Sequence, residues 1–85
     1  MELQQLKYFE VVAKYENMTR AAAELHIAQP AVSQSISRLE DELDTRLFDR
    51  KGKRISLNAQ GRFLLERLPE MLRPFSSLKD TASLL

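Results

Sequence analysis

The feature that most constrains the fold is the short connection between two helical patterns in AAAELHIAQPAVSQSISRLEDEL, residues 21–43. The first pattern ends near Leu25 and the second begins near Gln29, so only three residues lie between them. Helices joined this closely cannot lie antiparallel side by side. They cross at a steep angle, as in a helix-turn-helix. We expect Leu25 and Ile27 to pack inside that angle.

The second of these helices has two contrasting faces. Its apolar residues follow helical spacing and predict a buried stripe of Val32, Ile36, Leu39 and Leu43. The opposite side carries mostly short or amide-bearing residues: Gln29, Ala31, Ser33, Gln34, Ser37 and Arg38. A small polar face can enter the major groove of DNA, where amides and hydroxyls meet base edges. The alternative interpretation is an ordinary solvated helix face.

The rest of the chain predicts a mainly α-helical protein with one small hairpin. Apolar spacing favours a helix over residues 2–15, and Asn17 is suited to cap a second helix from Met18 to Leu25. The runs RLFDR and RISLN surround Gly52 and predict a two-stranded hairpin over residues 46–57. Asn58 is placed to cap a fourth helix that starts at Ala59.

Charge is distributed unevenly along the chain. Residues 1–44 contain four basic and eight acidic residues, a net charge of −4, whereas residues 45–85 contain nine and four, a net charge of +5. The basic residues concentrate around the predicted hairpin at Arg46, Arg50, Lys51, Lys53 and Arg54. This asymmetry indicates an anionic partner, although solvated lysines and arginines would explain the hairpin alone.

Several other classes of function are disfavoured. The 85 residues predict a single domain. Without cysteine, and with His26 as the one histidine, the sequence offers no metal cluster and no nucleophile–base pair, so we expect no cofactor and no enzymatic activity. We expect His26 to pack in the turn or lie at its rim. The acidic run Glu40, Asp41 and Glu42 predicts a solvated helix end. No signal peptide or membrane span is predicted, and the expected location is the cytoplasm, at the nucleoid.

With these motifs in register, residues 2 to about 66 resemble the N-terminal region of LysR-type transcriptional regulators. The densest similarity lies in AAAELHIAQPAVSQSI, LEDEL and RLFDR. The resemblance implies a winged helix-turn-helix in residues 1–58, with the helix-turn-helix at about 18–37 and the wing at about 46–57. It also implies a linker and dimerisation helix at 59–85. The family's C-terminal effector-binding domain has no counterpart here, so we expect a DNA-binding fragment rather than an unusually short member.

The resemblance also assigns roles to individual residues. Base reading is implied for Gln29, Pro30, Ala31, Ser33 and Gln34. Contact with the DNA backbone or minor groove is expected from Thr19, Arg20, Ser37, Arg38, Arg50, Lys51, Lys53 and Arg54. The implied partners are a double-stranded, pseudo-palindromic DNA operator and a second copy of the chain. A tetramer remains open for the full-length protein, and a small-molecule effector would act only through the missing domain.

Two residues depart from the family pattern. Position 28 is often a serine that caps the recognition helix, and Ala28 cannot replace that hydrogen bond. Position 44 is usually a glycine suited to a left-handed helix end, which Asp44 tolerates less well.

The last segment carries the apolar stripe that we assign to dimer contact: Leu64, Leu65, Leu68, Leu72 and Phe75, continued by Leu78. Pro69 and Pro74 interrupt it, so the linker helix is expected to be kinked or to end early. Alternatively, the stripe folds back over the domain's own core. The rival function is a winged-helix module for protein interaction or dimerisation that makes no DNA contact. It explains the apolar stripe but leaves the small polar face and the basic hairpin unexplained.

Overall fold

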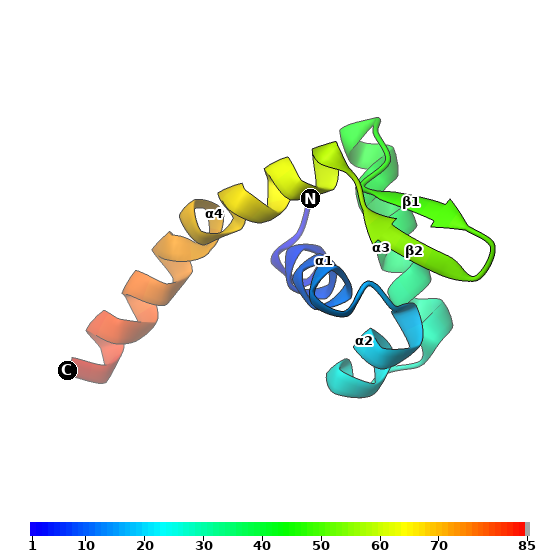
Figure 1. Cartoon of the computed structure of the whole chain (residues 1–85). Coiled ribbons are helices and arrows are strands. Elements are labelled where there is room, and N and C mark those ends of the chain that lie inside the picture. The colour runs from blue at the N-terminus through cyan, green and yellow to red at the C-terminus, as the bar shows by residue number, and fades with distance from the viewer. Residues whose placement is uncertain (85) are drawn as a thin grey trace.

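The chain forms four helices and one hairpin. A computed structural model describes the backbone of residues 1–84 and the side chains of residues 1–72. In chain order the elements are α1 (Leu3–Tyr15), α2 (Met18–Leu25), α3 (Gln29–Leu43), β1 (Phe48–Lys51), β2 (Arg54–Leu57) and α4 (Ala59–Leu84). Figure 1 shows α1, α2 and α3 grouped together, the hairpin projecting beside α3, and α4 extending away from them. This arrangement confirms the predicted mainly α-helical fold.

The core lies where α1, α3, the start of the hairpin and the first half of α4 meet. Its largest fully buried side chains are Phe9, Ile36, Leu39, Leu47, Leu68, Val12 and Val32. The ring of Phe48 packs against that of Phe9 with their centroids 5.6 Å apart. On α2, Ala21 and Ala22 are buried, and their small side chains allow neighbouring helices to approach closely. The predicted stripe of α3 is therefore confirmed, with Leu43 partly buried at its end.

The turns between the helices are made without glycine. Glu16, His26 and Asp44 end α1, α2 and α3, and each adopts a left-handed conformation, with φ of 48°, 58° and 52°. Non-glycine residues enter this region at a small energetic cost, and each of the three offsets part of it by donating its backbone N–H to a carbonyl of the helix that it ends. His26 is exposed at the rim of the turn, and Leu25 and Ile27 are partly buried against the core.

Helix starts follow the sequence expectations closely. The Asn17 side chain accepts from the Arg20 N–H at 2.9 Å, and the Asn58 side chain accepts from the Gly61 N–H at 2.8 Å. Pro30 lies in the first turn of α3, where its missing N–H costs nothing. Ala28 makes no side-chain cap to α3, as the departure from the family pattern predicts.

The hairpin is shorter than expected. Its strands are antiparallel and pair Phe48 with Leu57 and Lys51 with Arg54, while Gly52 turns between them with φ of 59°. Arg46 and Leu47, which belong to the predicted wing, precede the first strand. Leu47 and Phe48 are both buried in the core, so the first strand begins inside the core and leaves it after Phe48.

Of the two alternatives for α4, a kink or an early end, the early end does not occur. The helix runs from Ala59 to Leu84, past both Pro69 and Pro74. In Figure 1 its axis bends where yellow passes into orange. A proline removes one intrahelical hydrogen bond and displaces the preceding turn, which bends a helix without ending it when the flanking residues remain good helix formers.

Candidate nucleic-acid interface

The first half of α3 presents the small polar face that the sequence predicts. Gln29, Pro30, Ala31 and Gln34 are exposed, and Ser33 is half-buried. On the opposite side of the same helix, Val32, Ile36 and Leu39 have no solvent exposure. The exposed face is therefore carried on a helix that the core fixes in position.

One hydrogen bond within this face was not anticipated. The Gln29 amide Nε2–H donates to the Ser33 hydroxyl at 2.8 Å, one helical turn further on. The bond orients both side chains before any partner arrives. It leaves the Gln29 carbonyl oxygen as an acceptor and the Ser33 hydroxyl proton as a donor for other groups.

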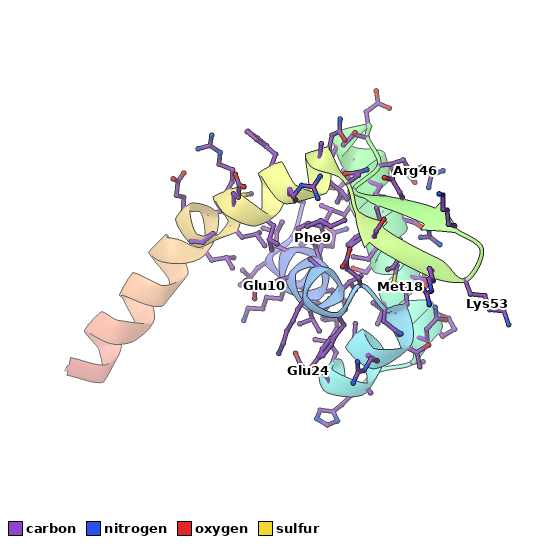
Figure 2. All side chains as sticks on the ribbon, viewed as in Figure 1. Phe9, Glu10, Met18, Glu24, Arg46 and Lys53 are labelled. Carbon is purple, nitrogen blue, oxygen red and sulfur yellow. The ribbon has the colours of Figure 1, made fainter. Side chains whose placement is uncertain are left out.

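A groove brings three elements together beside this face. It has a volume of about 370 Å³ and is lined by residues of the start of α2, the start of α3 and the hairpin. Thr19 and Gln29 meet Arg50, Lys53 and Arg54 there. Residues up to 39 positions apart in sequence, from Glu16 to Ile55, thus share one surface, on which three side chains are cationic. Lys53 extends from the tip of the hairpin, away from the helices (Figure 2).

Other predicted contact residues lie outside this groove. The Arg20 guanidinium lies over the Tyr15 ring, 5.6 Å from its centroid, toward the end of α1. Lys51 lines a separate hollow on the hairpin with Asp49 and Arg54. Ser37 is exposed on α3, and Arg38 borders a second groove between α1 and α3, together with Gln34. The candidate interface is thus wider than the groove alone.

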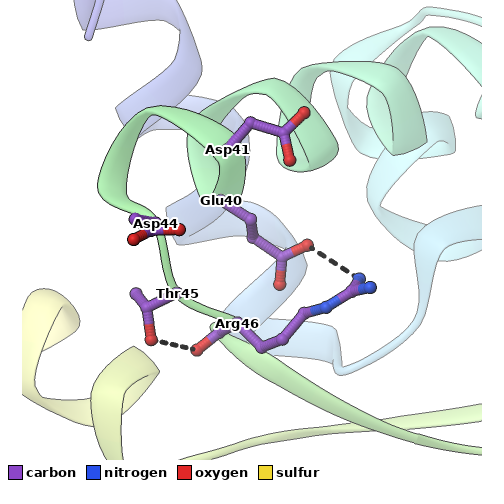
Figure 3. Close-up of a pocket in the computed structure, with 5 residues that line it drawn as sticks. All are labelled: Glu40, Asp41, Asp44, Thr45 and Arg46. Atoms are coloured by element: carbon purple, nitrogen blue, oxygen red, sulfur yellow. Dashed lines mark hydrogen bonds and ion pairs between the residues drawn. The ribbon is translucent and has the colours of Figure 1, made fainter.

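The acidic run at the end of α3 is solvated only in part, which corrects the prediction from the sequence. Asp41 and Glu42 are exposed as expected, but Glu40 is only 5% exposed. Its Oε2 accepts from the Leu47 N–H at 2.8 Å, and its Oε1 lies 3.7 Å from the Arg46 guanidinium (Figure 3). Position 40 follows Ile36 by four residues and so lies at the edge of the buried stripe. That spacing is the signal in the sequence that indicates burial.

Two further residues at the base of the hairpin were missed. The Glu16 carboxylate accepts from the Leu57 N–H at 2.7 Å, a contact between residues 41 positions apart that no local pattern indicates. Gly61 is buried in the first turn of α4, where an added Cβ would lie 2.2 Å from the Leu47 carbonyl oxygen. A glycine inside a helical pattern was the available signal, since it usually marks a close approach.

The apolar stripe of α4 is not a spare surface. Leu68 has no solvent exposure within the single chain, and Leu64, Leu65 and Leu72 are partly buried against the core. Leu68 therefore covers the domain's own core, whereas Leu64, Leu65 and Leu72 keep part of their surface exposed. Phe63, on another side of α4, is 60% exposed. The side chains of Phe75 and Leu78 lie outside the described residues.

The geometry defines a class of protein: a helix-turn-helix with a basic two-stranded wing. The model of the family described as bacterial regulatory helix-turn-helix protein, lysR family, matches residues 3–62. The chain belongs to this family.

Curated relatives agree with that assignment. The chain is 43% identical over 89 residues to the RuBisCO operon transcriptional regulator of Allochromatium vinosum, covering 96% of this chain and 30% of the relative. It is 51% identical over 67 residues to the HTH-type transcriptional regulator CatR of Pseudomonas putida, covering 79% of this chain and 23% of the relative. The chain thus spans less than a third of the length of either protein.

Solved structures include two complexes with DNA. The CbnR_DBD-DNA complex superposes with a TM-score of 0.88 at 36% identity, covering 98% of this chain and 95% of that one. The BenM_DBD/benA site 1 DNA complex gives a TM-score of 0.88 at 31% identity, covering 98% and 96%. Among the residues that the structure describes, none of the helices is long and apolar enough to cross a membrane.

Proposed function

We propose that this chain binds double-stranded DNA with sequence specificity, as the DNA-reading part of a bacterial transcriptional regulator, and that it acts by binding rather than by catalysis. The exposed face of α3 enters the major groove, and the basic wing follows the adjacent backbone or minor groove. The observation that carries the proposal is the groove shared by Thr19, Gln29 and the cationic residues of the wing. Support also comes from the similar chains solved in complex with DNA. The expected place of action is the cytoplasm, at the nucleoid.

Base reading is assigned to the residues of the polar face at the front of α3: Gln29, Pro30, Ala31, Ser33 and Gln34. A glutamine amide can pair with both N6 and N7 of adenine, and such a contact discriminates by about 1–3 kcal/mol. Gln34 is exposed, so its amide is accessible to a base edge. Gln34→Ala should therefore relax preference at one base pair of each half-site. Selection from a random DNA library would measure it, and an unchanged motif would refute the assignment.

Contacts that raise affinity for DNA of any sequence are assigned to exposed residues of α2, α3 and the wing: Thr19, Arg20, Ser37, Arg38, Arg50, Lys51, Lys53 and Arg54. Phosphate contacts position a protein on DNA and release bound counterions, so they make binding steeply salt-dependent. Lys53→Ala should weaken binding to all sequences by a similar factor and flatten the logarithmic salt slope by about one unit. Gel shifts at several salt concentrations test this. Glu66→Gln on exposed α4 is a matched control away from the wing.

A gel shift also separates this function from its rival, a winged-helix module that contacts only protein. Binding that falls steeply between low and moderate salt supports DNA contact through phosphates. Absence of DNA binding even at low salt, with a folded protein, would favour the rival. The exposed ring of Phe63 favours this rival, because it offers an apolar surface to a protein partner.

Pairing of two copies through α4 is the remaining part of the proposal, with half-sites about one helical turn apart or multiples of that. Because Leu68 is already buried, its substitution by glutamate would damage the core rather than test an interface. Leu72→Glu, at a partly buried residue, is the better variant, with Glu70→Gln as its control. Sedimentation with and without operator DNA should show a weaker dimer for Leu72→Glu. An effector would bind only a segment beyond these residues.

A further inference from the structure

Few apolar side chains of the wing are buried against the rest of the domain. In β1 only Phe48 is buried, and in β2 Ile55 and Leu57 are half-buried while the remaining strand residues are exposed. An isolated two-stranded hairpin is marginally stable in water. The orientation of the wing must therefore be set by contacts at its base.

Two carboxylates bind that base from opposite sides. The Glu40 Oε2 accepts from the Leu47 N–H at 2.8 Å, immediately before β1. The Glu16 Oε2 accepts from the Leu57 N–H at 2.7 Å, at the end of β2. Since Leu57 pairs with Phe48, these two amides lie across the hairpin from each other at the point where both strands leave the helices. Hydrogen bonds to ionised groups are stronger than those between neutral groups.

One carboxylate lies on an element that carries predicted DNA-contact residues, and the other directly precedes such an element. Glu40 lies on α3, whose first half forms the exposed polar face. Glu16 ends α1 directly before Asn17, the cap of α2, and lines the groove that contains Thr19 and Lys53. The two bonds thus join the wing to α3 and to the turn that leads from α1 into α2.

We propose that Glu40 and Glu16 are positioning residues for DNA binding. Their carboxylates act on backbone amides at the base of the wing rather than on bases or phosphates. By fixing the Leu47 and Leu57 amides, they set the orientation of the cationic wing relative to the polar face of α3. This inference rests on the proposed DNA-binding function and names residues that act through the wing.

The burial of Glu40 supports a positional role. Removing a carboxylate from water is costly unless its oxygens are well paired, and Glu40 Oε1 has no hydrogen-bond partner besides the ion pair with Arg46 at 3.7 Å. A polar group this poorly compensated adds little to stability. The other oxygen, Oε2, nevertheless accepts from the Leu47 N–H, directly before the first residue of β1.

The test uses Glu40→Gln and Glu16→Gln, with Asp41→Asn as the matched control. Glutamine preserves the shape of the side chain but replaces a charged acceptor by a neutral one. Asp41 is an exposed acid next to Glu40, so its variant removes a charge from the same helix without touching the wing. In the absence of DNA, amide hydrogen exchange should become about tenfold faster at Leu47 in Glu40→Gln and at Leu57 in Glu16→Gln. The control should leave both amides unchanged.

DNA binding then distinguishes positioning from general stability. Each glutamine variant should weaken binding several-fold and flatten the salt slope, because the wing loses phosphate contacts. In a Lys53→Ala background the same substitution should lower the DNA affinity by a much smaller factor, because the contact between the wing and DNA is already reduced. The proposal would be overturned by an equal loss of DNA affinity in the wild-type and Lys53→Ala backgrounds. Unchanged hydrogen exchange at the Leu47 and Leu57 amides would also overturn it. Glu16→Gln, at an exposed residue, provides the result if Glu40→Gln does not fold.

DNA binding by the wild type and by the glutamine variants separates the proposed function from the positioning role. If the wild-type chain binds no DNA at low salt, the proposed function is wrong and the positioning role falls with it. If the wild type binds and the glutamine variants bind equally well with the same salt slope, only the positioning role is wrong. Amide exchange without DNA reports on the two hydrogen bonds in either case.

Discussion

The recognition helix α3 and the wing face the same groove but are held by different forces. Three side chains of α3 with no solvent exposure, Val32, Ile36 and Leu39, anchor it in the core. The wing projects with most of its strand residues exposed, and the Leu57 and Leu47 N–H groups at its base donate hydrogen bonds to Glu16 and Glu40. Apolar burial fixes a helix as a rigid body, whereas a few polar bonds fix a hairpin only at their points of attachment.

The difference matches what each element is proposed to do. Reading base edges requires a rigid face, because hydrogen-bond geometry at a base tolerates little displacement. Following a phosphate backbone is a less exacting task, and long lysine and arginine side chains can adapt to small movements of the wing. Stability and sequence choice should therefore depend mainly on α3, and salt-dependent affinity mainly on the wing.

The largest effect is expected from removing an anchor of α3. Ile36→Ala deletes a fully buried side chain and leaves a cavity, which should lower the free energy of unfolding by about 2–5 kcal/mol. Chemical denaturation measures the loss. Ser37→Ala, one residue further on and exposed, is the control and should remain near the wild type. A small effect at Ile36 would mean that the core does not hold α3 in the way described.

The next effect is expected at the base of the wing. Gly61→Ala would gain up to about 1 kcal/mol of helix propensity. A Cβ 2.2 Å from the Leu47 carbonyl oxygen and 2.5 Å from Leu57 must displace backbone, and overpacking of this kind costs about 1–3 kcal/mol. The variant should therefore be less stable in thermal unfolding. Gln60→Ala, exposed in the same turn, provides the comparison. An increase in stability would show that α4 and the wing separate easily.

A smaller effect, of opposite sign, is expected at the start of α3. Ala28 has the extended backbone of an N-cap, with φ of −71° and ψ of 142°, but no side-chain acceptor. Ala28→Ser should offer a side-chain acceptor to the Ala31 N–H, which already donates to the Ala28 carbonyl at 3.0 Å, and should stabilise the fold by at most about 1 kcal/mol. Denaturant midpoints measure the gain. No gain would indicate that the first turn of α3 is already fully satisfied.

The smallest effect is expected at a contact that involves neither α3 nor the wing. Hydrogen bonds from the Tyr15 hydroxyl and the Lys14 ammonium hold the pKa of the Glu24 carboxyl below its usual range. A lowered pKa in the folded state gives a contribution to stability that is present above the ordinary pKa of a glutamate. It is lost as the pH falls through the lower, folded-state pKa. In Tyr15→Phe the pKa of Glu24, followed by NMR, should rise, while DNA affinity at neutral pH should not change. A change in affinity would show that this contact is coupled to the interface.

Some of these features could be predicted because they depend on near neighbours in the chain. The bounds of α2, the caps at Asn17 and Asn58 and the turn at Gly52 follow from the properties of one or a few adjacent residues. The buried stripe of α3 follows from the 3.6-residue period of a helix. The face opposite the stripe was predicted with it, although its contact with bases is a proposal.

Other features depend on residues that only folding brings together. The bond between Glu16 and Leu57 joins positions 41 apart, and the close approach of Gly61 to Leu47 requires α4 to pack on the base of the wing. Leu68 looks like part of a free apolar stripe in the sequence, yet it completes the core. Glu40 looks like part of a solvated acidic run, yet a backbone amide outside its helix binds it.

By itself, the sequence determined the helices, their caps, the hairpin and the resemblance to a family, because each of these depends on short-range periodicity or on a motif. Only the tertiary structure decided which apolar residues had surface left and which acids were buried. Burial is a property of the packed whole, since a side chain's exposure depends on the elements that cover it, and no local pattern specifies those elements.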